Sequence, residues 1–153
     1  MASTFSQIYI HLVFSVKHRE ALIDKEMKDE LLKFIAGIFG KKNHKLLAIN
    51  AMPDHIHIFF DMNPDVRLMD LVREIKANSS RFIHSAFPGK IKFQWQEGYG
   101  AFSYAQSQKK IVINYIMNQE EHHRKRSFRD EYIEFLKRYE ITYDERYIFD
   151  LKK

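Results

Sequence analysis

Residues 45–61 read KLLAINAMPDHIHIFFD. The apolar runs over 45–52 and 55–61 each predict a strand. Between them, Met52-Pro53-Asp54 predicts a tight turn, because Pro and Asp favour turns. The stretch is therefore expected to form an antiparallel hairpin, and its neighbours decide which fold that hairpin belongs to.

The flanking segments place the hairpin in a β-α-β-β-α-β order. Apolar stripes at helical spacing predict helices, the first of which Asp24 can cap, and alternation predicts strands. The expected elements are strands over 5–16, 45–52, 55–61 and 91–95, and helices over 24–39, 68–87, 107–122 and 127–139. A short extended piece over 101–105 is also expected, after a flexible break at residues 98–100. This order is typical of an α+β, ferredoxin-like (RRM-like) antiparallel sheet with helices on one face and the other face open, followed here by C-terminal helices.

Length and composition indicate one domain and exclude several classes of protein. The chain has 153 residues, 45% of them hydrophobic, so it is not a disordered polypeptide. It has no cysteine, which excludes a thiolate nucleophile and a cysteine-based zinc site. We expect a single domain over 1–153, with a core over 1–97 and a hinge, helices and tail over 98–153. No apolar run approaches the roughly 20 residues of a membrane span, and residues 1–16 do not resemble a signal peptide, so a cytoplasmic location is expected.

Charge is unevenly distributed along the chain. The net charge is +5, and residues 90–130 hold eight Lys and Arg against four Asp and Glu. A localised basic excess favours a polyanionic partner such as a nucleic acid. A solvated surface with a chance excess explains the same count.

Two histidines mark the second half of the hairpin. Residues i and i+2 of a strand lie on one face, so His55 and His57 are expected side by side, with Cα atoms about 7 Å apart. Ile56, Ile58 and Phe60 lie on the opposite face, toward the first two helices. Two neutral imidazoles aimed at one point indicate a divalent-metal site that lacks its remaining ligands. The alternative is a pair of surface histidines on a half-exposed strand.

A second motif lies on the helix predicted over 107–122. Tyr115 and Gln119 are four residues apart and share a helix face. A tyrosine hydroxyl can attack a phosphate when a nearby cation stabilises its phenolate, and the amide oxygen of Gln119 can complete a metal site. The spacing fits an ordinary amphipathic helix equally well. The chain has eight tyrosines, so spacing alone does not select Tyr115.

Together these motifs resemble those of the single-tyrosine HUH transposases of the smallest bacterial insertion sequences, the IS200-like family, where U is a hydrophobic residue. Pro53 to His57 matches the family pattern P-D-H-U-H, and Tyr115 to Gln119 looks like its Y-x-x-x-Q helix. The segments Trp95 to Tyr99 and Phe102-Ser103 look like the segment that precedes this helix in the family. The first strand, which ends in the basic Lys17-His18-Arg19, also fits the family. The resemblance covers nearly the whole chain.

The resemblance implies a chemistry and a partner. Such enzymes cut single-stranded DNA with a tyrosine that forms a 5′-phosphotyrosine, releases a 3′-hydroxyl and is later displaced at a new junction. By this likeness Tyr115 is the nucleophile, and His55, His57 and Gln119 hold Mg²⁺ or Mn²⁺. The likeness also implies a bacterial homodimer that binds DNA hairpins at the ends of a mobile element. The sequence leaves open whether Tyr115 acts within its own chain or in trans.

The basic excess then has a candidate role in holding the DNA backbone. The candidate contacts, which flank the Tyr115 helix, are Lys109, Lys110, Arg124, Lys125 and Arg126. The roles of His11, His122 and His123 stay open.

Two other classes of function also stay open. One is a non-catalytic RRM-like module that binds single-stranded nucleic acid, which leaves the two motifs unexplained; the other is an HUH nickase of the replication- or conjugation-initiator type. A domesticated transposase is not separable from a mobile one by sequence.

Overall fold

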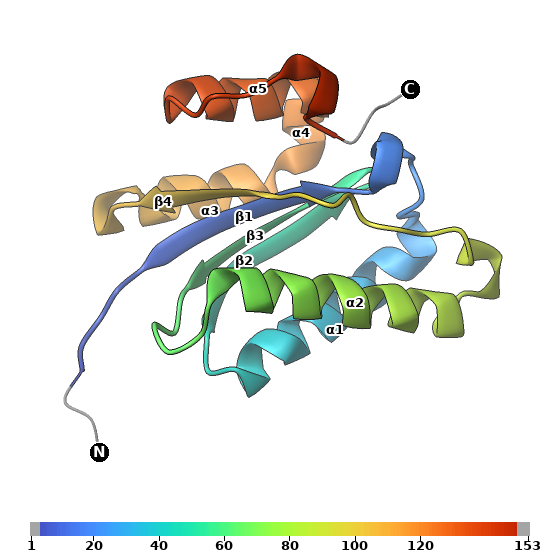
Figure 1. Cartoon of the computed structure of the whole chain (residues 1–153), viewed down its shortest axis with the longest axis horizontal. Helices are drawn as coiled ribbons and strands as arrows, with labels where there is room; N and C mark the ends of the chain where they lie inside the picture. The colour runs from blue at the N-terminus through green and yellow to red at the C-terminus, as the bar shows by residue number, and fades with distance from the viewer. Residues whose placement is uncertain (1–3, 150–153) are drawn as a thin grey trace.

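A four-stranded antiparallel sheet forms the centre of the fold (Figure 1). The structure is a computed structural model that describes residues 4–149. The strands are β1 (Tyr9–Ser15), β2 (Lys45–Met52), β3 (His55–Asp61) and β4 (Gly100–Tyr104), in the spatial order β2-β3-β1-β4. The turn at residues 53–54 joins β2 and β3 as the predicted hairpin. Since β3 pairs with β2 on one side and β1 on the other, its register is fixed and its side chains alternate strictly between the two faces.

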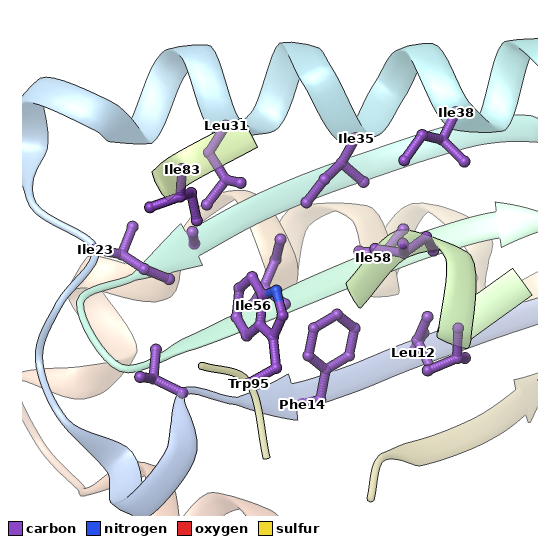
Figure 2. Close-up of a cluster of buried hydrophobic side chains, with 14 of the residues drawn as sticks. Leu12, Phe14, Ile23, Leu31, Ile35, Ile38, Ile56, Ile58, Ile83 and Trp95 are labelled. Atoms are coloured by element: carbon purple, nitrogen blue, oxygen red, sulfur yellow. The ribbon is translucent and has the colours of Figure 1, made fainter. Parts of the chain in front are cut away.

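Two long helices, α1 (Lys25–Lys41) and α2 (Leu68–Ala86), pack on one face of the sheet (Figure 1). Asp24 caps α1 as expected, because its side chain accepts a hydrogen bond from the Met27 amide. Side chains from α1 meet those of the central strands in the main core (Figure 2). The fully buried residues that the figure labels at this contact are Leu31, Ile35, Leu12, Phe14, Ile56 and Ile58.

The opposite face of the sheet is covered by the C-terminal helices α3 (Lys109–Met117), α4 (Gln119–His123) and α5 (Phe128–Arg138) (Figure 1). Two smaller apolar clusters form there, one between α5 and β1–β4 around Val13 and Phe102, the other between α3 and β3 around Phe59. Short helical turns lie at Lys17–Arg19, Pro88–Lys90, Gln106–Gln108 and Glu145–Tyr147. The predicted ferredoxin-like α+β fold is confirmed, and the face expected to be open is covered. No helix within residues 4–149 is both long and apolar enough to cross a membrane.

The fourth strand was predicted in the wrong segment. Residues 91–95 form no strand, and their one ladder contact is an isolated bridge between Trp95 and Val16. The free edge of β1 is occupied by Gly100–Tyr104 instead, which pairs with residues 9–13. Phe93 and Trp95 are buried against the main core, so the apolar pattern there signalled burial without strand pairing.

The helix predicted over 107–122 is also not continuous. It is broken at Asn118, whose backbone angles (φ −107°, ψ 32°) lie outside the helical range, and Asn is a residue that tolerates such a break. Tyr115 therefore lies on α3 and Gln119 begins α4. The other three predicted helices agree with the structure to within two residues at each end.

Gly100 allows the close approach of α5 to β4. A Cβ atom at this position would lie 2.9 Å from Tyr132 Cε1 and Oη, which is closer than such atoms can pack. We expect Gly100→Ala to lower the free energy of unfolding by about 1–3 kcal/mol, because the clash must be relieved by shifting α5. Urea unfolding followed by circular dichroism measures this decrease. Gly98→Ala is the matched control, because no described atom lies within 4 Å of the place that its Cβ would take; equal decreases in the two variants would contradict the prediction.

Candidate metal and nucleophile site

β3 directs His55 and His57 toward the face covered by α3, α4 and α5, and both side chains are fully buried. Their ring centroids are 5.0 Å apart. The Nδ1 atom of His55 lies 2.7 Å from Asp54 Oδ1, and the Nδ1 atom of His57 lies 2.8 Å from His11 Nε2. These contacts orient the two rings and leave both Nε2 atoms available to a shared ligand.

Burial favours the neutral form of His57 and of His11 beside it. It lowers the pKa of His57 well below its ordinary value of 6.5, and the neighbouring His55 lowers it further. Burial also lowers the pKa of His11, helped by His57 beside it. A neutral imidazole retains the lone pair that binds a metal ion. The Nε2 atom of His57 is buried and makes no hydrogen bond within the described part of the chain, so a metal ion would supply the partner it lacks.

Three further side chains converge on these nitrogens from the C-terminal helices. Gln119 Oε1 lies 3.4 Å from His55 Nε2. Glu131 Oε1 lies 3.4 Å from His57 Nε2 and 3.1 Å from His123 Nε2. One ligand atom from each of His55, His57, His123 and Glu131 lies within 4.8 Å of the others. Nitrogen and oxygen donors this close together fit a divalent metal ion.

Glu131 is a site residue that the sequence motifs did not indicate. Its side chain is buried, and burial raises its pKa to about 7, an effect that the nearby His55 opposes. A signal for it does exist in the sequence. Phe128, Glu131, Tyr132 and Phe135 follow the i, i+3, i+4, i+7 spacing of an inward stripe, so a carboxylate stands in the middle of an otherwise aromatic face.

Tyr115 lies beside this cluster, within the same chain. Its ring centroid is 6.0 Å from that of His57, and its carbonyl oxygen is 3.3 Å from Gln119 Nε2. The Arg126 guanidinium donates a 3.4 Å hydrogen bond to the Tyr115 hydroxyl. Tyr115 and Arg126 also line a cavity of about 270 Å³ together with Arg138. The structure thus brings the predicted nucleophile and the predicted ligands His55, His57 and Gln119 to one place.

Of the five predicted DNA-contact residues, Lys109 and Lys110 begin α3, Arg124, Lys125 and Arg126 follow α4, and only Arg126 has a described contact with Tyr115. Lys110, Arg124 and Lys125 are exposed, while Lys109 and Arg126 are half-buried. Arg124 pairs with Glu121 at 3.4 Å, and Arg126 pairs with Glu134 as well as contacting Tyr115.

The three histidines whose roles the sequence left open all lie at the site. His11 contacts His57, and His123 contacts Glu131. The ring centroid of His122 lies 4.6 Å from that of Tyr115. Spacing along the chain could not reveal this, because β1, β3, α4 and α5 meet only in the folded protein.

Known proteins share the sequence and the fold. The chain is 24% identical to the ISDra2 transposase TnpA of Deinococcus radiodurans over 119 aligned residues. The aligned region covers 74% of this chain and 84% of that protein. The chain is 25% identical over 115 residues to the transposase of insertion sequence IS200 of Salmonella typhimurium, covering 71% and 74%.

Two solved structures have the same fold. A crystal structure of a candidate transposase from Deinococcus radiodurans matches with a TM-score of 0.65 at 24% identity, over 78% of this chain and 95% of that one. A REP-associated tyrosine transposase bound to a REP hairpin matches with a TM-score of 0.57 at 17% identity, over 80% and 73%.

The sheet, the buried histidine pair on its covered face and these relatives place the protein in the class of DNA transposases. The family model described as "Transposase IS200 like" matches residues 4–119, which is most of the chain. The protein therefore belongs to the IS200-like transposase family, as its motifs predict.

Proposed function

We propose that this transposase cleaves and rejoins single-stranded DNA at the ends of an insertion sequence through a 5′-phosphotyrosine on Tyr115. The observation that carries the proposal is the convergence of Tyr115 and Gln119, from successive helices, on the buried pair His55 and His57. In this proposal His55, His57 and Gln119 hold Mg²⁺ or Mn²⁺. When bound, the ion would polarise the scissile phosphate and offset the charge that develops on it.

The chain's own residues have definable roles in this chemistry. The Tyr115 hydroxyl gives up its proton to solvent as its oxygen attacks phosphorus, the bond from phosphorus to the 3′-oxygen breaks, and the released 3′-oxygen takes up a proton from solvent. In the reverse step a 3′-hydroxyl attacks the phosphotyrosine, loses its proton and restores free Tyr115. The Arg126 guanidinium, which donates to the Tyr115 hydroxyl, stabilises negative charge on that oxygen. Asp54 and His11 contact the Nδ1 atoms of the two imidazole rings, which turns both Nε2 atoms toward the proposed metal position.

The proposed partner is a DNA hairpin next to an unpaired segment, as the hairpin-bound structural relative suggests. A homodimer is the proposed working form. Ile111 and Met117 leave apolar surface exposed on α3, where a second copy could cover it. A native mass of one chain at working concentration would contradict the dimer.

A cleavage assay tests the proposal directly. The purified protein is incubated with labelled single strands from both flanks of its own gene, in Mg²⁺ or Mn²⁺, and the products are separated under denaturing conditions. We expect a labelled protein–DNA adduct that depends on the metal, with EDTA and the matching duplexes as negative controls. Binding without cleavage of either flank would favour the non-catalytic module and overturn the proposal.

Contacts between the basic residues and the DNA phosphates can be tested through the salt dependence of binding. We expect Lys109→Ala with Lys110→Ala to weaken single-strand binding to every sequence alike and to reduce the slope of log affinity against log salt by about 1.4, which is roughly 0.7 for each phosphate that is no longer neutralised. Fluorescence anisotropy over a salt series measures both effects. Lys33→Ala with Lys41→Ala on α1, on the other side of the sheet, is the matched control. An unchanged slope in the first pair would exclude these lysines from the interface.

A further inference from the structure

Glu131 lies among three imidazoles rather than beside one. Its Oε1 atom is 3.1 Å from His123 Nε2, 3.4 Å from His57 Nε2 and 3.9 Å from His55 Nε2. In a tetrahedral zinc site with ligand bonds of about 2.1 Å, neighbouring ligand atoms are roughly 3.4 Å apart. The three separations from Glu131 are close to that value, and every pair of ligand atoms among the four side chains lies within 4.8 Å. The four side chains therefore already face one position, and the wider pairs would draw together by about 1 Å around an ion.

The surroundings of these atoms also point to a ligand. His57 Nε2 is fully buried and without a hydrogen bond among the described residues, although it faces Glu131. The far side of each β3 imidazole is already engaged, His55 by Asp54 and His57 by His11. This is the arrangement in which a second group orients a metal-binding histidine. A buried nitrogen that makes no hydrogen bond, 3.4 Å from a buried carboxylate oxygen, is satisfied by an ion bound to both.

The donor chemistry selects the kind of ion. Three imidazole nitrogens and one carboxylate oxygen suit Zn²⁺ or a similar transition metal, which accepts four ligands of this kind. Mg²⁺ prefers six oxygen ligands and keeps several waters, so it is poorly matched to three imidazoles.

From this geometry we infer that His55, His57, His123 and Glu131 form a four-ligand binding site for a zinc-like transition metal ion. Its ligand set differs from the His55, His57 and Gln119 set of the proposed function, because His123 of α4 and Glu131 of α5 take the place of Gln119. In this arrangement the Gln119 amide faces the outer oxygen of the carboxylate, with its Nε2 atom 3.4 Å from Glu131 Oε2. The inference concerns metal binding by the DNA-free protein and holds whether or not the chain cleaves DNA.

A closed ligand set has a mechanical consequence. Four protein ligands fill a tetrahedral ion and leave no position for a phosphate oxygen. Two of the ligands lie on β3, while Glu131 lies on α5, so the ion would join α5 to the sheet. Zn²⁺ would thus stabilise the arrangement seen here, in which all four ligand side chains are buried or nearly so.

Zinc titration of the full-length, metal-stripped protein tests the site. Isothermal calorimetry with ZnCl₂ should give one site per chain, and Zn²⁺ should raise the melting temperature much more than the same concentration of Mg²⁺. We expect Glu131→Gln to weaken Zn²⁺ binding by about tenfold or more. Glu134→Gln is the matched control, because it makes the same change three residues along α5 at an exposed carboxylate.

Cobalt provides a readout of ligand geometry that does not depend on affinity. Co²⁺ bound in the wild-type protein should show the intense visible absorption of a tetrahedral ion, and both Glu131→Gln and His123→Ala should reduce it. The His123 side chain is 11% exposed, whereas that of Glu131 is fully buried, so the His123 variant serves if Glu131→Gln fails to fold. Zinc affinity within twofold of wild type in the folded Glu131→Gln or His123→Ala variant would overturn the inference, as would the absence of zinc binding by the wild type. DNA cleavage does not enter this test, so the two proposals can fail separately.

Discussion

Tyr115→Phe is expected to abolish the covalent protein–DNA adduct. The change removes one oxygen, and that oxygen is the atom proposed to form the bond to phosphorus. Loss of a nucleophile that no other group replaces reduces the rate by about 10³-fold or more. Denaturing electrophoresis of end-labelled single strands in Mn²⁺ measures the adduct, and anisotropy with the same strands should show that the variant still binds DNA.

A second tyrosine provides the matched control for this variant. Tyr104 lines the same cavity as Tyr115, yet burial raises the pKa of its hydroxyl above the ordinary value, which makes it a poor source of phenolate. Tyr104→Phe should therefore leave adduct formation within a few-fold of wild type. An adduct that persists in Tyr115→Phe and disappears in Tyr104→Phe would show that Tyr115 is not the nucleophile.

Local patterns were sufficient for the parts of the site that lie on one element. The i, i+2 spacing of His55 and His57 on a strand already placed both rings on the face away from Ile56 and Ile58, and the structure agrees. Strand alternation is imposed by backbone geometry, so it survives whatever packs above it. The capped start of α1 was predictable for the same reason, since the cap is a contact between residues three apart.

Long-range packing decided the parts that local patterns could not. The apolar residues near Phe93 satisfy a strand pattern, but the free edge of β1 pairs with Gly100–Tyr104, and no local signal tells which of two extended segments takes that edge. Glu131 was missed because a carboxylate on a helix is normally solvated. Its burial results from α5 docking across β1 and β4, and the residues it contacts are contributed by β3 and α4.

Loss of the His57 imidazole is expected to have the other largest effect. His57 is the member of the pair whose Nε2 atom is buried and makes no hydrogen bond among the described residues, although it lies 3.4 Å from Glu131 Oε1, and His11 contacts the other nitrogen of the ring. His57→Ala removes one of the imidazole ligands from either proposed set, so the bound ion loses affinity and position. If the ion contributes several kcal/mol to the transition state, cleavage should fall on the order of 10³-fold. Rate measurements over a range of Mn²⁺ concentrations would separate weaker binding of the ion from a lower maximal rate.

The His57 variant needs a control for folding, because the side chain is fully buried. His84→Ala on α2 is suitable, since His84 lies on the other side of the sheet and its Nε2 atom hydrogen-bonds the Phe93 carbonyl oxygen. Both variants should be less stable, seen as a lower melting temperature, but only His57→Ala should lose cleavage. A folded His57→Ala protein that cleaves at the wild-type rate would show that His57 is not a ligand of the catalytic metal ion. It would also contradict the proposal that this ion assists the attack by Tyr115.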